Sequence, residues 1–149
     1  MAGRQLQAVP ASPGRTSSAP IEEIALERRG FGRDPYMLAF RRDGTATLTT
    51  RGVLGEDHSC SGSVASDGFE ALADLIQRAG FFGLEKAYRH NELQDGEAVT
   101  TSAFVGGRLK VVANSNQAGP PNLKAIEDAI DALGEKTSWA GSRPSKTER

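Results

Sequence analysis

The sequence predicts an α+β fold, a two-layer sandwich in which an antiparallel sheet of about five strands carries two helices on one face. Three observations predict it. Glycine-containing turn signals stand at Asp43-Gly44 and Gly106-Gly107, each between two strand-like runs, and hairpins make antiparallel pairing the default. An amphipathic helical stretch follows each hairpin. Because each helix has one apolar stripe, both helices need an apolar sheet face to cover.

Length and composition indicate one ordinary globular domain. The chain has 149 residues, of which 38% are hydrophobic and 25% charged. The 18 basic and 19 acidic residues give a net charge of -1, which argues against a dedicated nucleic-acid binder. A single cysteine, Cys60, excludes an internal disulfide and a cysteine-only metal site. No apolar run approaches the roughly 18 residues of a membrane span, and we expect no cofactor.

Two tails, residues 1–20 and 141–149, are predicted to be disordered around a single domain at residues 21–140. The first tail is rich in Pro, Ser, Gly and Ala, so it cannot bury enough apolar area to offset the entropy of ordering it. It also lacks the apolar segment of a secretory signal peptide. As it stands, the sequence predicts a cytoplasmic protein, or an exported one if a signal has been removed.

The stretch from residue 21 to residue 29 fits both a helix and a strand. Helical spacing would align Ile21, Ile24 and Arg28, with a proline near the first turn. Strand spacing would instead align Ile24 with Leu26. The pattern alone favours the helix.

The first hairpin lies within residues 31–51, and the chemistry of its side chains decides its register. A two-residue Asp43-Gly44 loop would mix apolar and polar side chains on both faces. A three-residue loop with Gly44 in the left-handed conformation separates them, so this second register is predicted. The face with Arg41 and the threonines is then exposed to water. The buried face pairs Phe40 with Ala46 and Leu38 with Leu48.

A short third strand at residues 57–61 and a helix at residues 67–79 are expected next. Asp67 and Glu70 have the spacing of a capping box, in which two side chains satisfy free backbone N–H groups at the helix start. Gly80 supplies the stop. One apolar face marks this helix: Phe69, Leu72, Ala73 and Ile76.

The second hairpin is expected to join residues 99–105 to residues 108–113, after a core-packed segment at 81–84 and a long loop at 85–96. A two-residue Gly106-Gly107 turn pairs Phe104 with Leu109 and Ser102 with Val111. One face then holds Phe104, Leu109, Val111 and Ala113. The opposite, mixed face holds Val105, Arg108, Lys110 and Val112.

The second helix is predicted to begin at a cap formed by Asn122 and to end at Gly134. Its apolar stripe consists of Leu123, Ile126, Ile130 and Leu133. Trp139 is expected to fold back onto the domain.

The first functional hypothesis is a non-enzymatic binding or protein-interaction domain that uses the sheet face left open by the helices. A protein partner is expected, with no nucleic acid, and the chain is expected to be a monomer or a weak oligomer. The face would present Tyr36, Arg41, Thr47, Thr49, Arg108 and Lys110.

The alternative hypothesis is a small ligand-binding or hydrolytic domain with a pocket near Tyr36, His58, Tyr88 and His90. Cys60 lies two residues beyond His58 in a predicted strand, so both side chains would point the same way. One cysteine and two histidines leave little for a metal centre or a thiol nucleophile. The sequence carries no recognised hydrolase or phosphate-binding motif, so no catalytic residue and no metal ligand are assigned.

Short motifs spread over residues 21–139 carry a family resemblance. The matching pieces are Ile21-Glu22-Glu23-Ile24, Leu26-Glu27-Arg28, Phe31-Gly32, Pro35-Tyr36, Arg42-Asp43-Gly44-Thr45, Gly80-Phe81-Phe82, Leu84, Tyr88, Pro121, Leu123, Ala129-Ile130-Asp131 and Trp139. In these the chain resembles a family of small, uncharacterised bacterial domains that often follow export or lipoprotein signals.

The chain departs from that family at the start of the first hairpin. The family has a Cys-x-x-x-Cys-Pro-x-Tyr-like lead-in, whereas here both cysteines are absent and the Pro-Tyr spacing is shortened. Any redox or metal chemistry of those cysteines would be lost. The resemblance implies that residues 21–28 form a strand, which would give the run at residues 37–40 a partner.

Overall fold

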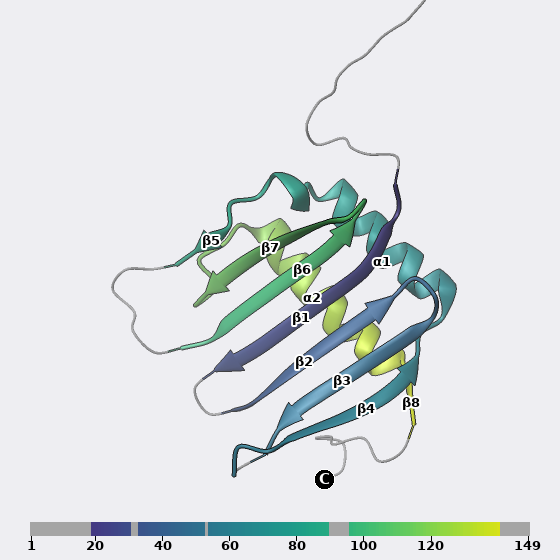
Figure 1. Cartoon of the computed structure of the whole chain (residues 1–149). Helices are drawn as coiled ribbons and strands as arrows, with labels where there is room; N and C mark the ends of the chain where they lie inside the picture. The colour runs from purple at the N-terminus through teal and green to yellow at the C-terminus, as the bar shows by residue number, and fades with distance from the viewer. Residues whose placement is uncertain (1–18, 31–32, 53, 90–95, 141–149) are drawn as a thin grey trace, which may run out of the picture.

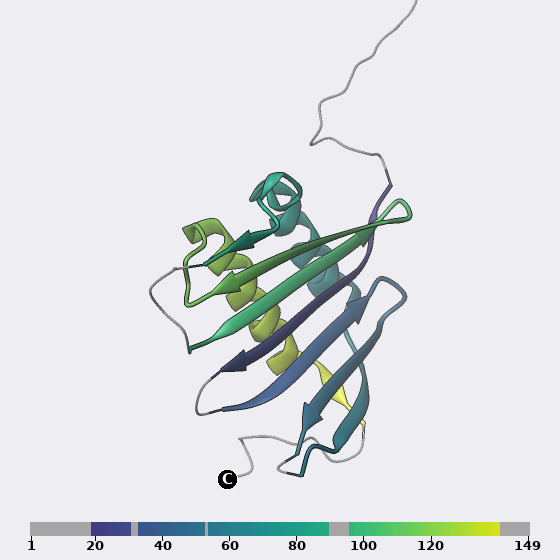
Figure 2. The ribbon, with the colours of Figure 1, turned by 60° about the vertical axis from the view of Figure 1, so that its left-hand side comes forward.

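An eight-stranded sheet, in the part of the chain that the structure describes, carries both helices against one of its faces (Figures 1 and 2). The computed structural model describes residues 19–30, 33–52, 54–89 and 96–140, so the two predicted tails lie almost wholly outside it. The strand order is β5-β7-β6-β1-β2-β3-β4-β8. All neighbours are antiparallel except β5 and β7. The predicted α+β class is confirmed, but five strands were too few.

Six strands form the body of the sheet, and two short ones lie at its edges. The six are β1 (Ile21–Gly30), β2 (Arg33–Arg41), β3 (Thr45–Arg51), β4 (Asp57–Ser63), β6 (Ala98–Val105) and β7 (Arg108–Ser115). The edge strands are β5 (Ala87–Tyr88) and β8 (Ser138–Trp139). Two residues carry no periodic signal, which is why β5 falls inside the predicted loop and β8 was not expected.

β1 is the central strand, so the strand reading implied by the resemblance is confirmed and the helical reading is wrong. It pairs with β2 on one side and with β6 on the other. Ile24 and Leu26 are completely buried, and both face the helices. Pairing on both sides overrides a local pattern that fits a helix equally well.

The first hairpin has the predicted register, with Phe40 opposite Ala46 and Leu38 opposite Leu48. All four side chains are buried. Gly44 has a φ of 95°, the left-handed conformation that the three-residue loop requires. The Asp43 carboxylate accepts a hydrogen bond from the backbone N–H of Thr45 at 3.0 Å, which fixes the turn.

Helix α1 (Ser66–Arg78) lies close to its predicted position, but its predicted cap is wrong. Ala65 is the N-cap residue, no side chain caps the helix, and Asp67 lies in the first turn. There its charge still favours the helix dipole. Gly80, with a φ of 79°, ends the helix as predicted and leads into the 3₁₀ turn η1 (Phe81–Gly83).

Helix α2 (Pro121–Lys136) also differs from its predicted ends. Pro120 is the N-cap residue, and the Asn122 side chain instead donates a hydrogen bond to the backbone oxygen of Ala79, at the end of α1. Gly134 does not stop the helix. It lies buried against Leu38, where a Cβ atom would come within 3.0 Å of the leucine side chain. Close packing, not chain termination, therefore explains this glycine.

The core lies between the helices and the sheet, and Trp139 closes one end of it. Its indole N–H donates a hydrogen bond to the backbone oxygen of Gly134 at 3.1 Å, as expected of a residue that folds back onto the domain. The largest fully buried side chains include Phe40, Phe69, Phe81, Ile76, Leu123, Ile126 and Ile130. Among the described residues, neither helix is long and apolar enough to cross a membrane.

Candidate functional site

The second hairpin has the predicted register but faces the other way. Phe104 lies opposite Leu109, as predicted. However, β6 also pairs with β1, which places Thr101 beside the buried Leu26 and turns Thr101 toward the helices. Phe104, an odd number of residues further on, must then point away from them. The predicted open face, with Arg108 and Lys110, is therefore the one toward the helices. No pattern within the hairpin sets its register against β1.

The apolar residues of this hairpin consequently form an exposed patch, which we call the β7 patch. It consists of Phe104, Leu109 and Val111, with exposed fractions of 36%, 60% and 39%. Leu109 and Val111 are alternate residues of one strand, and Phe104 lies directly across from Leu109. No described helix covers this face of the sheet (Figures 1 and 2). Contiguous exposed apolar side chains mark binding surfaces more often than scattered ones do.

The centre of the same open face is polar and small. The Arg41 guanidinium forms an ion pair with Glu23 at 3.0 Å and donates a hydrogen bond to the Thr47 hydroxyl at 3.1 Å. Glu23 is paired directly with Phe104, so this polar group adjoins the β7 patch, and the next pair along the two strands, Ala25 and Ser102, has short side chains. A face with short side chains at its centre permits close approach of another surface.

Half of the residues predicted for the open face do lie there. Arg41, Thr47 and Thr49 alternate with the buried Leu38, Phe40 and Leu48, which places them on the side away from the helices. The other three predictions, Tyr36, Arg108 and Lys110, are wrong about the face. The Lys110 side chain donates a hydrogen bond to the backbone oxygen of Leu84 on the helix side, and strand alternation places Arg108 on that side too. Tyr36 lies beneath α2.

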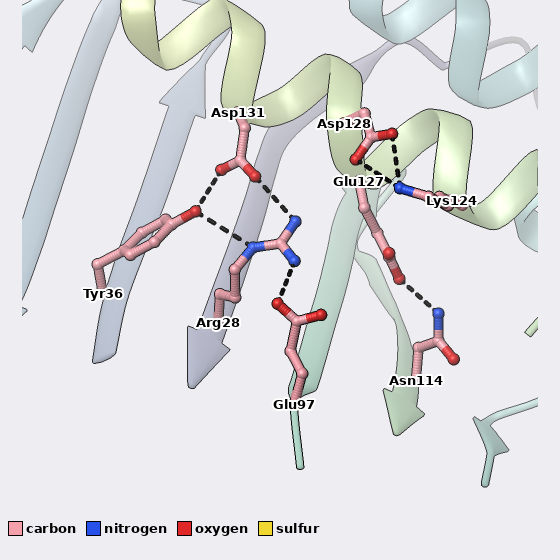
Figure 3. A network of polar contacts seen from close by, with 8 residues as sticks. All are labelled: Arg28, Tyr36, Glu97, Asn114, Lys124, Glu127, Asp128 and Asp131. Carbon is pink, nitrogen blue, oxygen red and sulfur yellow. Dashed lines mark hydrogen bonds and ion pairs between the residues drawn. The ribbon is translucent and has the colours of Figure 1, made fainter. Parts of the chain in front are cut away.

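Beneath α2, four side chains from different elements form a polar network, shown in Figure 3. Arg28 of β1 donates hydrogen bonds to Glu97 at 2.7 Å and to Asp131 at 2.8 Å. Its Nε also donates to the Tyr36 hydroxyl at 3.2 Å, and that hydroxyl donates to the second oxygen of Asp131 at 2.7 Å. The network therefore ties α2 to β1, to β2 and to the residue that precedes β6.

Burial, hydrogen bonds and neighbouring charges shift the pKa of two members of this network. Burial alone would lower the pKa of Arg28, but the hydrogen bond to Glu97 and the charge of Asp131 raise it further than burial lowers it. The guanidinium therefore stays charged. Burial and the hydrogen bond to Asp131 raise the pKa of Tyr36 to about 12, so its phenol stays protonated at neutral pH.

A second buried pair continues the network along α2. Asn114 of β7 donates a hydrogen bond to Glu127 at 2.8 Å, and its own carbonyl oxygen accepts one from the backbone N–H of Gly119 at 2.9 Å. Both side chains are nearly completely buried. Burial raises the pKa of Glu127, although the hydrogen bond from Asn114 opposes the shift.

The network satisfies its own groups, which favours a structural role. Three nitrogen atoms of Arg28 each donate to a neighbouring side chain, and both oxygens of Asp131 accept. A group that binds substrate keeps donors or acceptors directed at the substrate. Here they are directed at one another, so this cluster holds α2 in place.

Five members of these clusters were not predicted as site residues, and one signal points to Arg28 and to its carboxylate partners. Once residues 21–28 are read as a strand, alternation from Ile24 and Leu26 puts Arg28 on the buried face. A buried arginine needs carboxylate partners. Two carboxylates of α2, Glu127 and Asp131, each follow a buried isoleucine of the apolar stripe, so they are candidate partners. The missed residues are Arg28, Glu97, Asn114, Glu127 and Asp131.

The residues of the predicted pocket do not converge. His58 is exposed on β4, with its Nε2 3.4 Å from the Glu56 carboxylate. Tyr88 lies on β5, and its hydroxyl accepts a hydrogen bond from the backbone N–H of Glu85 at 2.9 Å. β4 and β5 are six places apart in the sheet order, or roughly 29 Å at the usual strand spacing. His90 lies outside the described residues.

No described group of His, Cys, Asp and Glu side chains has the arrangement of a metal site. Cys60 is half-buried on β4, and His58 precedes it by two residues in the same strand. Neither a protein-family match nor a similar curated protein was found for this sequence.

Proposed function

We propose that this domain is a two-layer sandwich whose open sheet face binds another protein, and that it acts by binding, not by catalysis. The observation that carries this proposal is the β7 patch of Phe104, Leu109 and Val111, exposed on the sheet face that no described helix covers. Burying three large apolar side chains would contribute about 25 cal/mol for each Å² of apolar surface removed from water.

The surroundings of the patch suit a protein partner. An interface commonly has an apolar centre and a polar, water-accessible rim. Here the apolar side chains lie beside the polar group of Glu23, Arg41 and Thr47, which is only partly exposed. Glu23 and Arg41 already neutralise each other in an ion pair. A partner that covers them therefore buries fewer unpaired charges than it would if the two side chains stood alone.

The test is a site-specific photo-crosslink in the cells that make the protein. Benzoylphenylalanine placed at position 104 should give a covalent adduct with a partner, identified by mass spectrometry. Leu54 provides the matched control, because it is also a large exposed apolar residue, 88% exposed, but it lies on the β3–β4 connection away from the patch. We expect the adduct from position 104 and not from position 54.

The partner must then depend on the patch. The purified partner should bind the unmodified domain and the Leu54→Ser variant equally, and the Leu109→Ser/Val111→Ser variant at least tenfold more weakly. Tenfold corresponds to about 1.4 kcal/mol, which the loss of two apolar contacts can supply. Equal binding by all three proteins would contradict a role for this face.

A further inference from the structure

The outer edge of β7 is only partly paired. On its inner side β7 pairs with β6 along its whole length. On its outer side β5 contacts only Ala113 and Asn114. The first five residues of the strand, 108–112, therefore have no neighbouring strand on that side among the described residues.

The backbone groups of two residues face this open edge. The backbone N–H of Ala113 donates to the oxygen of Lys86 at 2.9 Å, so Ala113 directs its backbone groups outward. In a strand, alternate residues direct their N–H and C=O to the same neighbour. Leu109 and Val111 consequently direct theirs outward, and no hydrogen bond from a described residue reaches them. Such edges pair readily with an added strand.

The same two residues carry the β7 patch. Leu109 and Val111 place their side chains on the open face, with Phe104 behind them. A strand added to this edge would place every second side chain on that face, next to the patch. Those positions suit valine, leucine or another apolar residue.

The other side of the edge is basic. Arg108 and Lys110 alternate with the patch residues and lie on the helix side. Side chains of an added strand at the intervening positions would lie next to these two cations. Opposite charges across a strand pair stabilise it, and like charges destabilise it. The intervening positions therefore suit glutamate or aspartate.

A second copy of this chain fits the edge poorly. Antiparallel pairing of two β7 strands must keep Leu109 and Val111 on the same face. If the two-fold axis passes at Lys110, it places Lys110 opposite itself, and an axis at Leu109 places Arg108 opposite Lys110. Both registers oppose like charges. An axis at Val111 brings the partner against Ala113, which β5 already pairs.

The opposite edge of the sheet lacks these features. β8 pairs with Gly62 and Ser63 of β4, and the rest of that strand is polar. Its open-face side chains, Ser59 and Ser61, offer no apolar contact. Of the two described edges of the sheet, only the one at β7 has both unpaired backbone groups and exposed apolar side chains.

We propose that β7 binds an extended segment of another protein by strand addition, and that this segment alternates apolar residues with acidic ones. Backbone hydrogen bonds with Leu109 and Val111 would hold the segment, and the β7 patch and the pair Arg108 and Lys110 would select its side chains. This inference rests on the proposed function, since it names the partner class and the binding mode at one border of the same face.

The probe is a fluorescein-labelled eight-residue peptide in which valine and leucine alternate with glutamate. Its binding to the full chain is measured by fluorescence anisotropy, beside a peptide in which lysine replaces glutamate and a scrambled peptide of the first composition. We expect saturable binding of the alternating acidic peptide, at least tenfold tighter than either control. Equal binding of the acidic and scrambled peptides would overturn strand addition.

Two variants test the mode. Val111→Pro removes an outward N–H and leaves the pairing with β6 intact, because the bonds to β6 come from the even-numbered residues. This variant should bind the acidic peptide about threefold to tenfold more weakly than the unmodified chain does. The matched control is Ser59→Pro, at an outward position of the other edge, and it should leave peptide binding unchanged.

The charge argument has its own variant. Arg108→Glu, at an exposed position, should reverse the preference between the acidic and the lysine peptide. An unchanged preference would contradict the charge argument.

Hydrogen exchange keeps the inference testable if the proline variant fails to fold. On adding the acidic peptide to the unmodified chain, the amides of Leu109 and Val111 should exchange more slowly, and that of Ser59 should not. Protection of Ser59 without protection of Leu109 would place the peptide at the wrong edge. If the acidic peptide does not bind but a partner still crosslinks at position 104, only the strand-addition inference is contradicted. A partner that is indifferent to Leu109 and Val111 would instead contradict the proposed function itself.

Discussion

The hydroxyl of Tyr36 donates a hydrogen bond of 2.7 Å to the carboxylate of Asp131, 95 residues further along the chain. The bond joins the beginning of β2 to the last third of α2, and the same carboxylate also pairs with Arg28. One acidic residue of the helix thus contacts two strands. Because these groups are at least partly buried, their contact contributes more than an exposed ion pair would.

Replacing Tyr36 by Phe should lower the free energy of unfolding by about 1–2 kcal/mol, because Asp131 loses a donor and Arg28 loses an acceptor while the ring remains. Urea unfolding monitored by circular dichroism measures the change. Tyr88→Phe is the matched control: its hydroxyl accepts one hydrogen bond from the nearby backbone of Glu85, and the expected change is smaller. A larger effect at Tyr88 would contradict the assigned role of the network.

The raised pKa of Tyr36 also predicts instability in alkali. Its folded-state pKa is about 12, against an ordinary value of 10.0. Between these values the unfolded chain releases the phenolic proton more readily than the folded chain, so stability falls as the pH rises from 10 toward 12. Tyr36→Phe should show a shallower loss than the unmodified protein over this range. Parallel curves would show that this tyrosine is not the cause.

Glu127→Gln should make stability less dependent on pH. Burial raises the pKa of Glu127 above its ordinary value of 4.5, so the folded state holds the proton more tightly than the unfolded state. The stability from this group is fully present below the unfolded pKa and is lost as the pH rises through the folded value. A glutamine oxygen can still accept the bond from Asn114, and it carries no charge.

The measurement is the urea midpoint between pH 4 and pH 8. We expect Glu127→Gln to be at least as stable as the unmodified protein at neutral pH and to show a flatter curve. Asp128→Asn is the control, since Asp128 is exposed in an ion pair with Lys124 on the same helix. It should leave the slope nearly unchanged. A steep slope that survives in Glu127→Gln would assign the pH dependence to another group.

Thr101→Val should stabilise the protein by about 1 kcal/mol. Thr101 is completely buried, and its hydroxyl oxygen has no hydrogen-bond partner within the described part of the chain. A buried hydroxyl without a partner costs free energy that a methyl group of similar size does not. The neighbouring Thr100, on the open face, provides the control, and Thr100→Val should change the midpoint by less than about 0.5 kcal/mol. Destabilisation by Thr101→Val would show that the hydroxyl is satisfied after all.

Local chemistry was enough to predict the hairpins and the helices. The register of the first hairpin followed from separating Phe40 and Leu38 from the threonines, and the left-handed Gly44 followed from the loop length. Caps were less predictable: Asp67 lies inside the first turn of α1 and caps nothing, and Asn122 donates its hydrogen bond to the end of α1 instead. Side-chain type shows what a residue can do at a helix end, and tertiary neighbours decide whether it does so.

The open face was harder to predict, because it depends on a pairing between distant segments. Phe104 and Val112 lie on opposite faces of similar hydrophobicity, and either face of the isolated hairpin could be buried. The pairing of Leu26 with Thr101 settles the question across 75 residues of sequence. The β7 patch is therefore visible only in the assembled sheet, whereas the residue pattern of the hairpin alone placed Arg108 and Lys110 on the open face.

Gly62→Ala should displace Trp139 and loosen the end of the sheet. A Cβ atom at position 62 would lie 2.6 Å from the indole Cε3 and 2.8 Å from the backbone oxygen of Ser138, closer than real Cβ atoms approach. The indole must move, which breaks its hydrogen bond to Gly134 and the pairing of β4 with β8. Overpacking of this kind typically costs about 1–3 kcal/mol.

Trp139 is the only tryptophan of the chain, so its fluorescence reports this change directly. We expect a red-shifted emission maximum and easier quenching by iodide in Gly62→Ala, because the ring becomes more exposed to water. Gly83→Ala is the matched control: a Cβ atom there meets no other atom within 4 Å. It should leave the emission unchanged. An unshifted spectrum in Gly62→Ala, with the variant folded, would mean that the indole does not rest on this glycine in solution.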